Sequence, residues 1–76
     1  MSEEIKVGQL WQVVSEKVFC LRTNYTGSYL FFELYFNDIA LIKSLHENKD
    51  QIFLVFDGKE ISLERKNLAD NFKRIV

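Results

Sequence analysis

The sequence predicts one small domain of mostly β structure, and three observations lead to that prediction. Apolar residues make up 47% of the 76-residue chain and aromatic residues 14%, which is too apolar for a disordered segment. The chain has no proline and no repeat or low-complexity tract, so no linker is visible. Its apolar residues fall in short runs rich in β-branched and aromatic side chains. We therefore expect residues 1–76 to form a single domain.

The first half of the chain contains three extended segments in order. Residues 10–14 follow Gly8 and predict the first strand, and residues 17–23 predict the second. A turn is expected at 24–27, where Gly27 adopts a positive φ at little cost. Residues 28–36 then predict a third, aromatic strand.

Residues 30–46 allow two interpretations. The first is strand–turn–strand, with the turn at Asn37-Asp38 and a further strand over 39–45. The alternative is an α+β fold with a helix over about 30–46, since apolar residues also recur there at near-helical spacing. The aromatic and β-branched residues of its first half favour the strands.

The second half begins with a β-hairpin. Residues 52–56 are apolar throughout, Asp57-Gly58 suits a type I′ turn, and residues 59–64 alternate. The alternation directs Ile61 and Leu63 to the core, and Glu60, Ser62 and Glu64 to water. Residues 67–71 then predict a short helical turn before a last strand over 72–76.

Two segments carry a resemblance to a known family. The run Phe32-Glu33-Leu34-Tyr35-Phe36-Asn37-Asp38-Ile39-Ala40-Leu41-Ile42 resembles the diverging turn of small SH3-like barrels, and residues 57–75 resemble their distal hairpin, 3-10 turn and closing strand. The opening Gly8 to Trp11 is similar to that of short barrel proteins encoded by bacteriophages. The resemblance implies a five-stranded SH3-like β-barrel with a short 3-10 turn near the C-terminus.

The sequence lacks the motifs by which members of this family recognise proline-rich peptides. The first strand reads Leu10-Trp11-Gln12-Val13 in place of Ala-Leu-Tyr-Asp-Tyr, and no tryptophan follows Trp11. Leu68 stands where the family has its last tyrosine. The resemblance therefore implies the fold but not a polyproline-binding groove.

The sequence offers little for catalysis or metal binding. Cys20 is the only cysteine and His46 the only histidine; we expect Cys20 to be a buried, inert thiol and His46 to lie in a polar loop. No enzyme activity, metal or cofactor is expected. The polar, acidic start of the chain does not resemble a signal peptide, which favours a cytoplasmic location.

The aromatic residues predict a protein-binding surface. Alternation places Tyr29, Phe31 and Tyr35 on one face of the third strand, with Tyr25 at the preceding turn. The opposite face, predicted to join the core, carries Leu30, Phe32, Leu34 and Phe36. Exposed aromatic residues on a rigid hairpin are typical of interfaces. The alternative is that the hairpin folds over the core and buries both faces.

Five basic residues suggest a second function class. They are Lys59, Arg65, Lys66, Lys73 and Arg74. If the last strand lay beside the helical turn, these side chains would cluster and contact the phosphates of a nucleic acid. The interleaved acidic residues and the net charge of -1 favour an ordinary solvated face instead. A third hypothesis is a homo-oligomer that pairs through an exposed strand edge.

Overall fold

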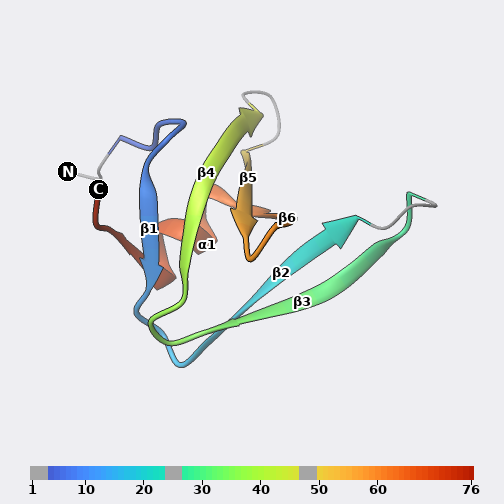
Figure 1. The fold of residues 1–76 in the computed structure, drawn as a ribbon, viewed down its shortest axis with the longest axis horizontal. Helices are drawn as coiled ribbons and strands as arrows, with labels where there is room; N and C mark the ends of the chain where they lie inside the picture. Colours follow the sequence, from blue (N-terminus) through green and yellow to red (C-terminus); the bar gives the residue numbers. More distant parts are fainter. Residues whose placement is uncertain (1–3, 24–26, 47–49) are drawn as a thin grey trace.

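The computed structural model describes residues 4–23, 27–46 and 50–76, which form one antiparallel sheet and a short helix (Figure 1). The elements are β1 (Leu10–Val13), β2 (Lys17–Thr23), β3 (Tyr29–Tyr35), β4 (Ile39–His46), β5 (Gln51–Phe56), β6 (Lys59–Glu64), α1 (Arg65–Asn71) and β7 (Phe72–Arg74). The strands lie side by side in the order β3-β2-β6-β5-β4-β1-β7. The predicted class, mostly β, is confirmed.

The strand–turn–strand interpretation of residues 30–46 is confirmed, and the helical alternative is wrong. The segment forms β3 and β4, which are separated by a turn at Asn37 with a φ of 76°. Asparagine tolerates this left-handed conformation better than most residues. Asp38 closes the turn, since its backbone N–H donates to Tyr35 O at 2.9 Å and its carboxylate accepts from Tyr35 N at 2.7 Å.

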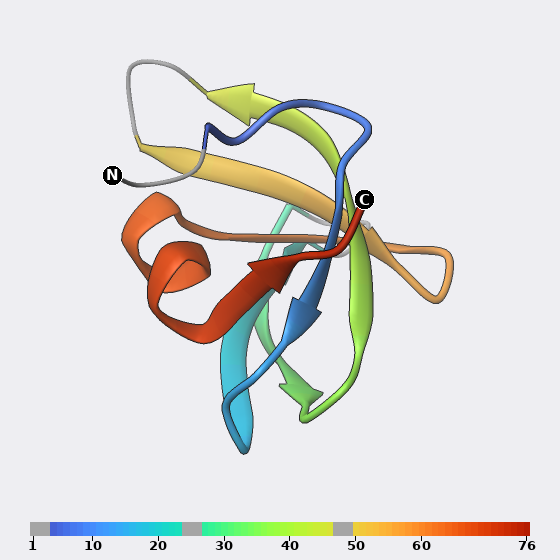
Figure 2. The same cartoon turned by 90° about the vertical axis from the view of Figure 1, so that its left-hand side faces the viewer.

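The predicted five-stranded closed barrel is wrong, because the sheet has seven strands and is open, with β3 and β7 at its two ends. The segments predicted as strands at residues 17–23 and 28–36 form two regular strands, which pair without interruption from Lys17↔Tyr35 to Thr23↔Tyr29 and so add to the five that the resemblance implied. The predicted 3-10 turn is a seven-residue α-helix, α1. Figure 2 shows α1 leading directly into β7, beside β1.

The Asp-Gly hairpin is confirmed in its register and its turn. Asp57 and Gly58 have φ values of 51° and 74°, as a type I′ turn requires, and Phe56 pairs with Lys59. Ile61 and Leu63 are buried as predicted.

Ser62 is also buried, against the prediction that it faces water. Because β6 is an interior strand, Ser62 has Leu21 of β2 directly beside it on one side and Phe53 of β5 on the other. Directly opposed residues share a face, so these two larger side chains cover the hydroxymethyl group.

The core lies inside the curved sheet, where α1 covers it. Leu68 is the buried residue of α1. The strands contribute a set of buried side chains that includes Trp11, Val13, Leu34, Ala40, Ile42, Ile52, Leu54, Ile61 and Phe72. Trp11 also donates from Nε1 to Gln9 Oε1 at 3.0 Å, which satisfies the indole N–H.

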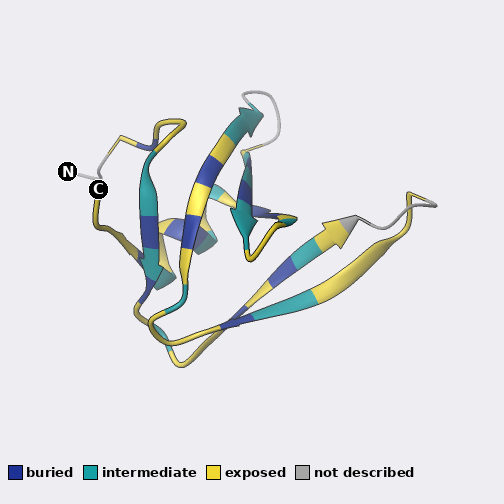
Figure 3. Ribbon diagram, viewed as in Figure 1, coloured by how far each residue is buried: buried dark blue, intermediate teal, exposed yellow. Residues whose placement is uncertain are grey.

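The β2–β3 hairpin, which we call the arm, projects from the rest of the molecule (Figure 1). Its base is buried at Val18, Cys20 and Leu34, whereas its outer part is exposed (Figure 3). Leu30 and Phe36, which the alternation assigned to the core, are 51% and 59% exposed. Leu30 lies on the same face of β3 as Leu34 but beyond the outer end of the core, and Phe36 lies in the turn after β3.

Candidate protein-binding surface

One side of the arm is lined by exposed aromatic side chains. Directly opposed residues of paired strands share a face, and the register pairs Lys17 with Tyr35, Phe19 with Glu33 and Leu21 with Phe31. Since Cys20 and Leu34 point into the core, all of these residues point away from it. The exposed fractions of the four aromatic residues on this side are 55% for Phe19, 66% for Tyr29, 82% for Phe31 and 50% for Tyr35. We call these four residues the aromatic face.

The structure places three of the four predicted binding residues together. Tyr29, Phe31 and Tyr35 share the exposed side of β3, and Tyr25 lies outside the described residues. Phe19 was missed by the sequence analysis. Alternation along β2 about the buried Cys20 would have placed it outside the core, but joining it to the tyrosines requires the β2–β3 register.

The charges on this side of the arm compensate each other. Lys17 Nζ lies 5.6 Å from the ring centre of Phe19, 6.0 Å from that of Tyr35 and 3.8 Å from Glu33 Oε2. The Tyr35 hydroxyl donates a hydrogen bond to Glu33, and the pKa of Tyr35 is raised because that bond favours the protonated phenol. The aromatic face therefore presents apolar area around one internally paired cation and anion.

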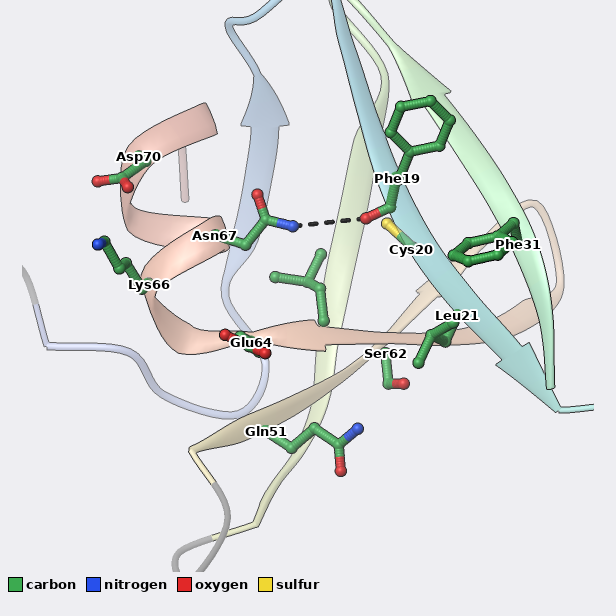
Figure 4. A pocket seen from close by; sticks show the side chains of 11 residues that line it. Phe19, Cys20, Leu21, Phe31, Gln51, Ser62, Glu64, Lys66, Asn67 and Asp70 are labelled. Atoms are coloured by element: carbon green, nitrogen blue, oxygen red, sulfur yellow. Dashed lines mark hydrogen bonds between the residues drawn. The ribbon is translucent and has the colours of Figure 1, made fainter.

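A groove of about 460 Å³ lies between the arm and α1 (Figure 4). It exists because β2 pairs with β6 only at Leu21 and Arg22, so the first half of β2 diverges from the sheet. Asn67 of α1 spans the gap by donating from Nδ2 to Phe19 O at 3.4 Å. Phe31 lines the arm side of the groove and Asp70 the helix side, so aromatic and polar groups meet there.

The five basic residues do not form one patch. Arg65, Lys66 and Lys73 line a hollow of about 750 Å³, together with Glu4 and Asp50. Arg65 Nε lies 3.6 Å from Asp50 Oδ1, which offsets its charge.

The other two basic residues lie apart from that hollow. Arg74 lines a smaller hollow with Glu4, Lys6 and Gln9. Lys59 Nζ lies 3.3 Å from Asp57 Oδ2 and 5.8 Å from the ring centre of Phe32. The structure therefore brings three of the five predicted nucleic-acid contacts together.

Cys20 is buried as predicted, and desolvation by burial raises the pKa of its thiol to about 12. The thiol therefore stays protonated near neutral pH. His46, expected in a loop, is the last residue of β4 and is half-buried, because pairing with Gln51 extends the strand to this position.

Neither a metal site nor a membrane-spanning helix emerges from the described residues. Within residues 4–23, 27–46 and 50–76, no three His, Cys, Asp or Glu side chains converge as metal ligands would. The helix in the same part of the chain is too short to cross a bilayer.

The comparisons with known proteins give no relative for this arrangement. The chain matches no family model, no curated protein and no solved structure.

Proposed function

We propose that this chain is a non-enzymatic interaction module that binds another protein through the aromatic face of the arm. The observation that carries the proposal is the exposure of four aromatic side chains on one side of a paired two-stranded ribbon. Phe31 alone is 82% exposed. Large exposed apolar patches are typical of interaction surfaces, and aromatic residues supply much of the energy at interfaces.

The arm also limits the entropy lost when a partner binds. Phe19 and Tyr35 lie on strands that are already paired, and both rings contact the same Lys17 ammonium group. An aromatic side chain has only two rotatable torsions to fix, so it gives a large contact area at a small ordering cost. The free arm therefore presents much of its binding surface in a fixed arrangement.

The surroundings of the aromatic face indicate the chemistry of the partner. The face itself has no unpaired charge among its described residues, because Lys17 and Glu33 lie together. The groove beside it adds hydrogen-bonding groups from Ser62 and Asn67 and charged groups of both signs from Glu64, Lys66 and Asp70. A protein surface with apolar side chains flanked by hydrogen-bonding groups fits this combination better than a highly charged polymer does.

The biological setting of the proposal is a small phage-encoded factor that binds or inhibits a host protein in the cytoplasm. This setting rests on the resemblance of residues 8–11 to the opening of short phage barrel proteins.

A pull-down from bacterial lysate, with nuclease present, tests the proposal. The informative variant is Phe19→Ala with Tyr35→Ala, and its matched control is Val7→Ala with Val14→Ala, which removes exposed apolar groups outside the arm. We expect one stoichiometric protein to bind the wild type and the control but not the arm variant. Equal capture by the arm variant, or no captured protein at all, contradicts the proposal.

A nucleic-acid-binding function is the alternative, and one observation favours it: Arg65, Lys66 and Lys73 line the same hollow. If it is correct, a labelled single-stranded oligonucleotide binds the chain and Arg65→Ala with Lys66→Ala weakens that binding. The affinity would also fall steeply between 50 and 200 mM salt, by about tenfold or more for several phosphate contacts. Under the leading proposal the oligonucleotide does not bind.

A further inference from the structure

The outer edge of β3 carries backbone groups that the sheet does not pair. β3 ends the strand order, so among the described strands it has β2 alone as a neighbour. In an antiparallel strand, successive residues direct their N–H and C=O groups to opposite edges. Phe36 N donates to Glu16 O on the β2 side, whereas the backbone of Tyr35 points the other way, to Asp38.

The same alternation directs the backbone N–H and C=O groups of Tyr29, Phe31 and Glu33 towards the outer edge of β3. Tyr35 is the fourth residue of this set, and Asp38 already occupies its N–H and C=O. Within residues 4–23, 27–46 and 50–76, no hydrogen bond reaches the N–H or C=O groups of the other three. The edge therefore offers three consecutive outward residues for pairing with another strand.

This edge lacks the features that usually prevent strand pairing between molecules. Soluble proteins protect sheet edges with lysine, proline, bulges or covering elements. β3 has the sequence Tyr-Leu-Phe-Phe-Glu-Leu-Tyr, and its register with β2 has no bulge. Its one charge, Glu33, is already engaged by Lys17 and by the Tyr35 hydroxyl.

We propose that two copies of this chain pair through their β3 edges, antiparallel about a two-fold axis at Phe31. In this register Phe31 of one copy lies opposite Phe31 of the other, and Tyr29 lies opposite Glu33. All three outward residues then exchange hydrogen bonds with outward residues of the second copy, both N–H and C=O being used in each pair.

Neighbouring registers use fewer of these groups. An axis one residue later, at Phe32, places Tyr29 opposite Tyr35, whose backbone is already bonded to Asp38. An axis one residue earlier, at Leu30, places Glu33 opposite Gly27, beyond the end of β3. The two-fold axis at Phe31 therefore gives the register in which the N–H and C=O groups of all three outward residues are hydrogen-bonded.

The side chains are complementary in the same register. Phe31, the most exposed large apolar residue of the arm, meets its own counterpart as a cross-strand aromatic pair. On the opposite face Leu30, which is 51% exposed, lies opposite Phe32 of the second copy. Glu33 faces a tyrosine rather than a second Glu33, so the two-fold axis brings no like charges together.

This inference goes beyond the proposed function and does not depend on it. Phe19 lies on β2, and the backbone of Tyr35 is outside the new ladder, so neither is needed for edge pairing. Pairing would place two copies of the aromatic face side by side on one continuous sheet. The Phe19→Ala, Tyr35→Ala variant should therefore lose its partner but keep its dimer.

Sedimentation equilibrium of the full chain over a range of concentrations tests the pairing. We expect the wild-type mass to rise with concentration to twice the 9.0 kDa of one chain. Phe31→Pro should stay at the single-chain mass, because proline removes an outward N–H without touching the β2–β3 ladder. Trp11 fluorescence checks that this variant is folded. A wild type that is monomeric throughout, or a folded Phe31→Pro that still dimerises, overturns the proposal.

Cysteine cross-linking tests the register independently. Opposed residues of a hydrogen-bonded pair have Cα atoms about 5.5 Å apart, within the range of a disulfide. Mild oxidation should therefore convert Phe31→Cys to a covalent dimer. Tyr29→Cys is the matched control, since the Cα atoms of its two copies lie about 14 Å apart in this register. Cys20 stays unreactive because it is buried. Equal cross-linking of both variants, or of neither, contradicts the two-fold axis at Phe31.

Discussion

Leu34→Ala should destabilise this protein more than Phe36→Ala, although alanine removes fewer atoms from leucine than from phenylalanine. Alternation along residues 28–36 assigns both side chains to the same apolar face. In the structure Leu34 is 0% exposed and packs in the core, whereas Phe36 is 59% exposed at the turn after β3. The comparison therefore tests where the core ends along the arm.

The exposures set the size of each effect. Truncating a fully buried leucine to alanine costs about 3 kcal/mol, as lost transfer energy and a residual cavity. Complete burial of a phenylalanine is worth about 1.5–3 kcal/mol, and only two-fifths of Phe36 is buried, so its truncation should cost about 1 kcal/mol. If both residues were in the core, the order would reverse, with about 3–5 kcal/mol lost at Phe36.

Urea unfolding followed by Trp11 fluorescence measures both values, since Trp11 is the single tryptophan and is 3% exposed in the folded state. A chain of this size has about 4–11 kcal/mol of total stability, so a loss of 3 kcal/mol moves the urea midpoint strongly. Equal losses, or a larger loss for Phe36→Ala, would refute the assignment of Phe36 to the surface.

Further predictions concern three single residues: Cys20, Gly58 and Asp57. Cys20 should resist a thiol reagent in the native protein and react once the chain is unfolded in urea. Burial raises the pKa of the Cys20 thiol from 9.0 to about 12, so the folded state keeps the thiol proton up to a higher pH than the unfolded chain does. The free energy of unfolding of the wild type, relative to that of Cys20→Ala, should therefore be constant below about pH 9 and fall as the pH rises towards 12. Gly58→Ala should cost about 1–2 kcal/mol in urea unfolding, because its φ is +74° and an added Cβ meets nothing within 4 Å, so the loss is conformational. Asp57→Asn, which keeps a residue tolerant of positive φ, should change the stability by less than about 0.5 kcal/mol.

Local sequence signals were enough to place the strands. Residues 17–23 and 59–64 form strands with the predicted bounds, and Asp57-Gly58 sets the hairpin register because few other dipeptides accept two positive φ angles. The α-helix of residues 65–71 was predicted only as a shorter turn. Leu68 is its one buried residue, too few for the helical period to show in the sequence.

The sequence did not reveal which strands are neighbours in the sheet. The burial of Ser62 depends on Leu21 and Phe53 lying beside it, and both are distant in sequence. The seven strand segments predicted along the chain match the seven strands of the sheet, whereas the five-stranded barrel came from the family resemblance alone. Phe19 joined the candidate site only through its pairing with Glu33.

Alternation also identifies which face of a strand points to the core, but not how far along the strand the core extends. Leu30 and Leu34 occupy equivalent positions in the alternation, yet Leu30 is 51% exposed and Leu34 is 0% exposed. The difference arises because the arm extends beyond the rest of the sheet.

Ordering the outer half of the arm contributes little to the stability of the folded monomer. Fixing each backbone residue costs about 1–2 kcal/mol, whereas a cross-strand pair contributes about 0.2–1 kcal/mol and Phe31 remains 82% exposed. A 76-residue chain has little stability to spare, and an isolated two-stranded hairpin is marginal in water. Apolar aromatic residues at such positions raise the risk of aggregation without strengthening the core. Contact with a second molecule, at the aromatic face or at the β3 edge, would offset both costs at once, and we therefore propose that the arm, rather than the basic C-terminal residues, carries the function of this chain.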